Sequence, residues 1–135
     1  MAVKSVSVSQ SSLLEREKDI LTQFGDCPEI LRYFGNDFTV EDGKEVYNIL
    51  LEFASQGNLH QLLKKSDMGL PVSDVRYYTR SILRGLSMIH EKGFVHCDIK
   101  LLNILVWGST EVKIANFGLA KKRNCDFDDG VSGLR

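Results

Sequence analysis

Apolar and polar residues alternate over residues 1–8, which is the pattern of a strand with one face buried. The pattern then changes to a helical period between Ser12 and Phe24, and Gly25 is placed to stop the helix. Ser12 followed by Glu15 resembles a capping box at the start of this helix. The predicted inward stripe consists of Leu13, Ile20, Leu21 and Phe24.

One charged residue falls on that inward stripe. Glu17 follows Leu13 by one helical turn and therefore lies on the buried side of the helix. A buried carboxylate is costly unless a cation meets it, so a basic partner is expected. A lysine in a strand most often faces solvent, but Lys4 on the preceding strand is the natural candidate here. We therefore predict an ion pair between Lys4 and Glu17.

Two further strand-like runs surround the turn residues Asp42 and Gly43. Residues 30–38 and 46–51 are rich in apolar residues, and an Asp-Gly pair between such runs is a good hairpin signal. The second run continues into LLEFASQGNL, where apolar residues give way to small and polar ones. The sequence thus predicts an antiparallel hairpin followed by a connector between two packing units.

The second part of the chain has helical periodicity. Residues 58–65 form a short helix candidate, and a stronger one runs from Ser73 to about His90. Its apolar residues recur every three or four positions, so they form a core-facing stripe and not a cofactor site. His60 and His90 have no acidic or cysteine neighbours at ligand spacing, which favours structural or exposed roles. The predicted stripe consists of Val75, Tyr78, Ile82, Leu86 and Ile89.

A polar stretch lies between apolar runs near the end of the chain. The segment VHCDIKLLNILV begins at Val95, and VKIANFGLA follows it. Two short strands are predicted at residues 104–107 and 112–115, so the polar residues before the first and after the second emerge at strand ends. Active loops commonly lie at such ends. An acid, a lysine and an amide at this spacing have the layout of a phosphoryl-transfer loop: Asp98, Lys100 and Asn103.

Composition limits the classes of protein that remain. The 135 residues allow one domain at most, and 43% hydrophobic residues are enough for a core. A net charge of −1 without a dense run of lysine and arginine argues against binding to nucleic acid or an anionic membrane surface. The sequence has no membrane-spanning apolar run and no signal-peptide core. We expect an intracellular protein of the cytoplasm or the nucleus.

The spacing of the three cysteines bears on whether the protein contains disulfides or a zinc site. Cys27, Cys97 and Cys125 are odd in number, far apart and without C-x-x-C spacing. This pattern disfavours a disulfide framework or a zinc site. They are interpreted as reduced thiols.

The polar stretch resembles a known catalytic motif. HCDIKLLN is similar to the HRDxKxxN catalytic loop of eukaryotic protein kinases, and NFG at Asn116 is similar to their DFG motif. MAVK resembles the family's VAIK strand, with Glu17 in the place of its helix glutamate. The position of Lys100 is typical of serine/threonine kinases. Cys97 and the opening MAVKSV are similar to the plant mitogen-activated protein kinase kinase kinases.

The resemblance implies an α+β fold, specifically a truncated two-lobed kinase-like fold. Residues 1–135 would form a partial protein kinase domain. It would comprise a strand-rich N-lobe portion at 1–51, a hinge at 52–57 and a helical C-lobe portion at 58–135. The chain would end within the activation segment, before the family's large lower helices. Part of the apolar face of the 73–90 helix should then be uncovered.

The resemblance also implies an activity, namely ATP-dependent phosphotransfer to serine or threonine of a protein substrate, a MAP kinase kinase, in a signalling cascade. On this interpretation Asp98 orients the substrate hydroxyl and Lys100 neutralises the transferred phosphoryl group. Magnesium would be bound by Asn103 and Asn116. ATP would be held by the ion-paired Lys4 and Glu17, the gatekeeper Leu51, the backbone of Glu52 and Ala54, and Leu105 under adenine.

The sequence departs from the family pattern at three further points, and the first two bear on activity. Asn116 replaces an aspartate, and magnesium prefers an anionic oxygen to a neutral amide oxygen. The sequence has no G-x-G-x-x-G lid, so bound phosphates should be exposed to water and ATP affinity should fall. Leu101 replaces the usual Pro or Gly, which is unusual but not diagnostic. An alternative function stays open: a catalytically impaired, pseudokinase-like fragment that binds a kinase partner or interferes with it.

Overall fold

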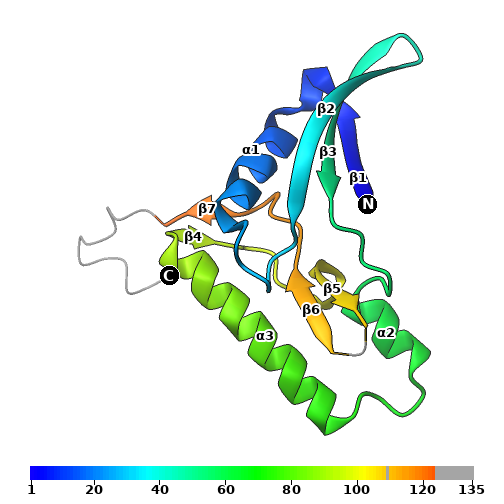
Figure 1. The fold of residues 1–135 in the computed structure, drawn as a ribbon, viewed down its shortest axis with the longest axis vertical. Helices are drawn as coiled ribbons and strands as arrows, with labels where there is room; N and C mark the ends of the chain where they lie inside the picture. Colours follow the sequence, from blue (N-terminus) through cyan, green and yellow to red (C-terminus); the bar gives the residue numbers. More distant parts are fainter. Residues whose placement is uncertain (109, 124–135) are drawn as a thin grey trace.

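A three-stranded antiparallel sheet forms the first part of the fold (Figure 1). The computed structural model describes residues 1–108 and 110–123. The sheet contains β1 (Ala2–Ser7), β2 (Tyr33–Glu41) and β3 (Lys44–Leu51) in the order β1-β3-β2. The predicted β2–β3 hairpin is confirmed, and its turn residues Asp42 and Gly43 have φ angles of 50° and 75°. Positive φ at both central residues matches the twist of the flanking strands.

Helix α1 (Ser12–Leu21) lies beside this sheet, between the 3₁₀ turns η1 (Val8–Gln10) and η2 (Thr22–Phe24). The predicted capping box at Ser12 is wrong, because the N-cap residue is Ser11 and its hydroxyl donates to Glu15 Oε1 at 2.6 Å. Leu13 was also misplaced on the inward stripe. It is 65% exposed, whereas Leu14 is buried, since the stripe through Glu17 and Leu21 passes one residue later.

The second part contains two helices, the predicted α2 (Leu59–Lys65) and α3 (Val72–Glu91). Asn58 caps α2, and its side chain accepts a hydrogen bond from Gln61 N at 2.9 Å. The two predicted short strands are present as β5 (Ile104–Trp107) and β6 (Glu111–Ile114). The 3₁₀ turn η3 (Leu101–Asn103) precedes β5, and the small pair β4 (Phe94–Val95) and β7 (Lys121–Lys122) was not predicted. The fold is α+β, as predicted.

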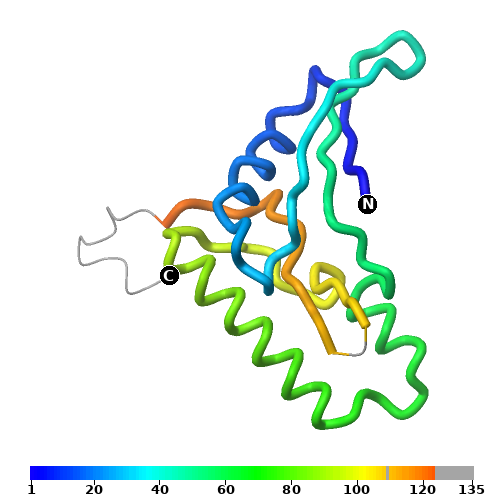
Figure 2. The backbone as a smooth tube through the Cα atoms, viewed as in Figure 1, coloured from blue at the N-terminus to red at the C-terminus, as the bar shows by residue number. Residues whose placement is uncertain are grey.

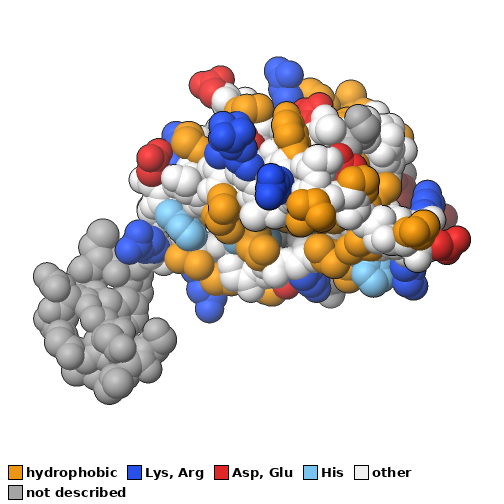
Figure 3. All heavy atoms as spheres, turned by 90° about the horizontal axis from the view of Figure 1, so that it is seen from below, with side chains coloured by type: hydrophobic (Ala, Val, Ile, Leu, Met, Phe, Trp, Pro, Cys, Tyr) orange, Lys and Arg blue, Asp and Glu red, His pale blue; other side chains and the backbone are white. Residues whose placement is uncertain are grey.

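Helix α3 is only partly covered. It buries Tyr78, Gly85 and Ile89, but Leu83 is 60% exposed. Val75, placed on the core-facing stripe by its spacing, is 46% exposed, so the stripe is not fully buried at the start of the helix. Figure 3 shows hydrophobic side chains among lysines and arginines on the lower face of the molecule, where α3 lies. The expectation of an incompletely covered helix is therefore confirmed for the described residues.

The segment before β2 joins the two parts along β6. Leu31 N donates to Ile114 O at 2.9 Å, and Ile114 N donates to Glu29 O at 2.8 Å. Figure 2 shows this segment of the chain beside β6, although the two are far apart in sequence. The core runs through this junction, where Ile30 and Ile114 are both buried.

A buried lysine forms an ion pair with the connector that follows β3 and begins at Glu52. Lys113 is 9% exposed, and its Nζ lies 2.8 Å from both carboxylate oxygens of Glu52. Trp107 lies beside this pair, with its ring centroid 5.0 Å from Lys113 Nζ and its Nε1 donating to Phe53 O at 2.8 Å. The β5–β6 hairpin thus anchors the connector, and nothing in the sequence pattern indicated a buried Lys113.

Three of the remaining expectations concern the surroundings of the fold. Among the described residues, no helix is long and apolar enough to cross a membrane. Cys27 is buried and Cys97 is exposed, and both are free thiols. Cys125 and the predicted end of the helical portion at residue 135 lie outside the described residues.

Candidate phosphoryl-transfer site

The β5–β6 hairpin brings the two predicted polar segments together. Ile104 pairs with Ile114, so the residues before β5 and after β6 leave the hairpin at the same end. Ala115 N also donates to Asn103 O at 2.9 Å, which extends the pairing by one step. Asn103 and Asn116 therefore lie next to each other even though the polar segments are separate in sequence.

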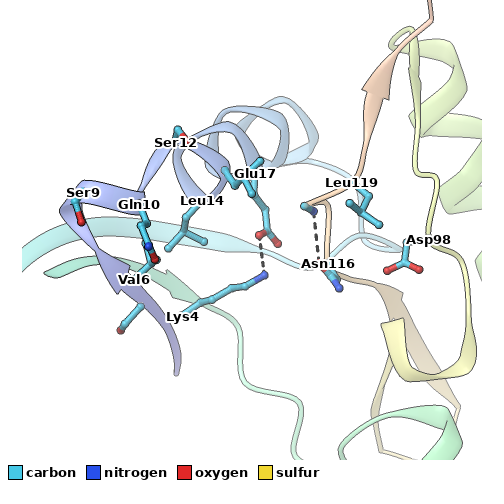
Figure 4. Close-up of a pocket in the computed structure, with 13 residues that line it drawn as sticks. Lys4, Val6, Ser9, Gln10, Ser12, Leu14, Glu17, Asp98, Asn116 and Leu119 are labelled. Carbon is cyan, nitrogen blue, oxygen red and sulfur yellow. Dashed lines mark hydrogen bonds and ion pairs between the residues drawn. The ribbon is translucent and has the colours of Figure 1, made fainter.

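A pocket of about 820 Å³ lies between β1, α1 and these segments (Figure 4). Four of the predicted site residues line it: Lys4, Glu17, Asp98 and Asn116. Ser9, Gln10 and Ser12 add polar side chains on the α1 side, and Leu119 adds an apolar one. The structure thus places the predicted acid, the predicted ion pair and the Asn116 amide around one cavity.

The predicted ion pair between Lys4 and Glu17 is confirmed. Lys4 Nζ lies 2.7 Å from Glu17 Oε2, and the side-chain exposures are 45% and 4%. The second carboxylate oxygen, Glu17 Oε1, accepts a hydrogen bond from Phe117 N at 3.2 Å. Glu17 therefore links β1 to the backbone that follows Asn116, while the ammonium group of Lys4 remains accessible from the pocket (Figure 4).

A chain of side-chain hydrogen bonds connects Asn116 to Asp98. Asn116 Nδ2 donates to Asn103 Oδ1 at 3.2 Å. Asn103 Nδ2 in turn donates to Asp98 O at 2.8 Å and to Asp98 Oδ2 at 3.0 Å. Lys100 Nζ lies 3.6 Å from Asp98 Oδ1, and the Lys100 side chain is 52% exposed. The structure thus brings Asp98, Lys100, Asn103 and Asn116 into one network.

Buried His96 sets the conformation of this loop and was not among the predicted site residues. Its Nδ1 accepts from Asp98 N at 3.1 Å, which leaves Nε2 to donate to Ala115 O at 2.9 Å. The ring is 1% exposed and packs edge-on against Phe117, with ring centroids 4.9 Å apart. The only sequence signal for this role is its position two residues before Asp98 in a motif-like stretch.

The pKa of His96 is lowered from its usual value near 6.5, chiefly by burial. The hydrogen bond to Ala115 O and the charges of Asp98 and Glu17 act in the opposite direction. Since the neutral ring is favoured in the folded state, its contribution to stability is complete above pH 6.5 and is lost as the pH falls toward the folded-state pKa.

We expect acidification from pH 7.5 to 5.5 to destabilise the chain through His96. Below pH 6.5 the free energy of unfolding should fall by up to about 1.4 kcal/mol per pH unit, because the unfolded state binds one more proton. Urea unfolding monitored by circular dichroism at each pH measures this slope. A His96→Gln variant, which keeps one donor and one acceptor, should have a flatter profile. An identical slope in both proteins would assign the pH dependence to other groups.

The predicted adenine-side residues do not line the pocket. Leu51 is buried at 7% exposure, and Glu52, Ala54 and Leu105 lie along the connector and the start of β5. Glu52 N already donates to Arg32 O at 2.9 Å, so its carbonyl is the backbone group left for a ligand. These four residues therefore do not line the cavity around Lys4 and Asp98, although Leu51 pairs with Ala2 on the strand that carries Lys4.

The amide pair fits a magnesium ion poorly. Magnesium is typically held through one or two carboxylates in near-octahedral geometry. Here Asn103 Oδ1 accepts from the Asn116 amide, and Asn116 Oδ1 accepts from Gly118 N at 3.4 Å. Within residues 1–108 and 110–123, no group of three or more His, Cys, Asp and Glu side chains is arranged to hold a metal ion. The predicted ligands are therefore neighbours, but their oxygens are engaged with protein donors.

Comparison with known proteins supports the resemblance noted in the sequence. The family model described as "Protein kinase domain" matches residues 1–128, which include the ion pair and the whole polar network. The chain belongs to the protein kinase family. The motif resemblance noted in the sequence and the geometry of the pocket therefore have the same explanation.

Its curated relatives include several plant kinases. Mitogen-activated protein kinase kinase kinase 20 of Arabidopsis thaliana is 53% identical over 93% of this chain. Kinase kinase kinases 17 and 18 of the same plant are 40% and 38% identical, each over 98% of this chain. The matches span 37%, 36% and 41% of these three relatives, respectively. The chain thus corresponds to less than half of each relative's length.

Proposed function

We propose that the chain binds ATP in this pocket and represents the nucleotide-binding part of a serine/threonine kinase of the MAP kinase kinase kinase type. The observation that carries the proposal is the 2.7 Å ion pair of Lys4 with buried Glu17, on the same cavity as Asp98. Glu17 holds the half-exposed ammonium group toward the pocket, where it can meet the phosphates of ATP. The relatives' names support the kinase class.

The reaction of this class transfers the γ-phosphoryl group of ATP to a hydroxyl of a protein. The hydroxyl oxygen bonds to phosphorus, the bond between phosphorus and the β–γ bridging oxygen breaks, and ADP leaves. Asp98 is proposed to orient the hydroxyl and accept its proton, and Lys100 to neutralise charge on the transferred group. The proposed substrate is a MAP kinase kinase in the cytoplasm or the nucleus, with no nucleic-acid or membrane partner.

The adenine ring is proposed to lie along the connector. Leu51 would act as the gatekeeper and Leu105 as the floor under the ring, with the Glu52 carbonyl and the Ala54 backbone at the adenine edge. The position of these residues between the two parts of the fold supports this assignment, since Lys113 and Trp107 hold the connector in place. Backbone contacts of this kind require no particular side chain.

A second candidate function is favoured by the hydrogen bond from Asn116 to Asn103. It engages the oxygen that would otherwise be available to a metal, and the loss of an anionic ligand lowers transition-state stabilisation. A thousandfold slower turnover would correspond to about 4 kcal/mol. On this alternative the chain binds nucleotide or a kinase partner without efficient phosphotransfer.

Nucleotide binding is tested first, by thermal unfolding with and without ATP. ATP at a hundred times its dissociation constant should raise the free energy of unfolding by about 2.7 kcal/mol. A Lys4→Ala variant should lose most of this increase, whereas Lys64→Ala, on the exposed face of α2, should keep it. Equal stabilisation of both variants would place the nucleotide elsewhere.

Phosphotransfer then separates the two candidate functions. Radiolabelled ATP and a purified MAP kinase kinase are incubated with the chain and with an Asn116→Asp variant. Transfer by the unmodified chain supports the kinase function. Binding of ATP by both proteins without transfer by either supports the impaired alternative.

A further inference from the structure

In the hydrogen bond between Asn103 and Asn116, the Asn116 amide is the donor and Asn103 Oδ1 is the acceptor. Asn103 Nδ2 makes two hydrogen bonds to Asp98, at 2.8 Å to its backbone oxygen and 3.0 Å to its carboxylate. Because Nδ2 faces Asp98, Asn103 Oδ1 must face Asn116. The amide nitrogen of Asn116 donates to that oxygen at 3.2 Å. The orientation of both amides thus follows from the Asp98 end of the network.

In this orientation both amide oxygens accept hydrogen bonds from protein donors. Asn116 Oδ1 accepts from Gly118 N at 3.4 Å, and Asp98 Oδ1 lies 3.6 Å from Lys100 Nζ. Asn103 is 6% exposed, so its polar atoms would be costly to leave without partners. The Asn116 N–H group therefore occupies the position at Asn103 Oδ1 where a metal ion would bind, but it carries no net charge.

We propose that the Asn103–Asn116 amide pair takes the place of a divalent cation, so that the pocket binds ATP without magnesium. This inference rests on the proposed ATP site but concerns its metal requirement alone. A magnesium ion would have to break the hydrogen bond from Asn116 and would gain only neutral amide oxygens from Asn103 and Asn116 in return. Lys4 supplies the positive charge that faces the phosphates.

An Asn116→Asp variant should require a divalent cation at this position, unlike the unmodified chain. In this variant a carboxylate oxygen faces Asn103 Oδ1. Both oxygens are hydrogen-bond acceptors, so they repel each other and no hydrogen bond forms between them. Asn103 cannot reverse its amide without losing both hydrogen bonds to Asp98. The backbone does not oppose the change, because Asn116 has a φ of 61° and Asp tolerates this left-handed conformation as Asn does. A cation between the two oxygens would relieve this contact, so we expect the variant to bind one.

The first experiment measures the unfolding temperature of the nucleotide-free chain in EDTA and in MgCl₂. The unmodified protein should be unaffected by magnesium, while Asn116→Asp should be less stable in EDTA and recover in magnesium. Asn36→Asp is the matched control, since Asn36 is exposed on β2 and accepts from Tyr33. Electron paramagnetic resonance of Mn²⁺ provides a second readout, with binding expected for Asn116→Asp alone. Metal binding by the unmodified chain, or its absence from Asn116→Asp, overturns the inference.

The second experiment measures the dissociation constant of ATP by calorimetry in EDTA and in MgCl₂. The two constants should agree within about twofold for the unmodified chain, whereas ATP should bind Asn116→Asp about tenfold more weakly in EDTA, because two unscreened anions then meet. Binding of ATP by the unmodified chain only in magnesium overturns the inference and leaves the proposed function standing. Failure to bind under either condition contradicts the proposed function instead, and the nucleotide-free experiment still decides the metal question.

Discussion

Replacing Lys4 by methionine should lower the free energy of unfolding by about 2 to 3 kcal/mol. Methionine fills a similar volume but leaves the Glu17 carboxylate, 4% exposed, with the N–H of Phe117 as its one remaining partner among the described residues. Removal of one partner from a fully buried ion pair costs about 3 to 5 kcal/mol, and we expect a smaller loss because Lys4 is 45% exposed. Urea unfolding at pH 7 measures the difference.

Substitution of Glu17, the other residue of the pair, should lower the free energy of unfolding by less. Glu17→Gln keeps an oxygen that can accept from Phe117 N, and the half-exposed Lys4 can be hydrated by water. We expect a loss of about 1 kcal/mol. In the double variant the buried charge is absent, so Lys4→Met should then cost much less than it does alone. Equal losses for the two single variants would show that burial of Glu17 is not what makes the pair asymmetric.

This ion pair was predictable because it depends on local periodicity and one electrostatic rule. The helical spacing placed Glu17 on the inner side of α1, and Lys4 was the basic residue on the neighbouring strand. The same kind of local signal identified the β2–β3 hairpin from its Asp-Gly turn. Leu13 shows the limit of the method. Leu13 and Leu14 are both apolar and lie on opposite sides of Glu17 around the helix, each within about 60° of it, so spacing alone does not tell which of the two is buried.

The network around Asp98 depends on packing that periodicity does not report. Strand prediction placed Asn103 and Asn116 at strand ends, but their contact follows from the pairing of Ile104 with Ile114. The direction of each amide is determined by hydrogen bonds that exist only in the folded chain. Lys113 was missed for a related reason, because its partner Glu52 lies in a different part of the chain and neither residue stands out in its own segment.

Substitution of Phe117 by alanine should lower the free energy of unfolding by about 4 kcal/mol, the largest single effect expected here. Phe117 is completely buried, and its ring centroid lies 4.9 Å from that of His96 and 5.9 Å from that of Phe24. Alanine would lose the buried apolar area and leave a cavity at the centre of the site. Chemical unfolding of the variant measures the loss directly.

The exposed Phe53 provides the matched control for this substitution. Phe53→Ala removes the same atoms from a side chain that is 59% exposed, and the backbone oxygen that accepts from Trp107 remains. Its cost should stay below about 1 kcal/mol. Loss of the Phe117 ring should also weaken ATP binding, because its packing against His96 and Phe24 positions the backbone N–H that donates to Glu17, whereas Phe53→Ala should be less damaging. Similar losses in the two variants would mean that the aromatic cluster does not stabilise the site.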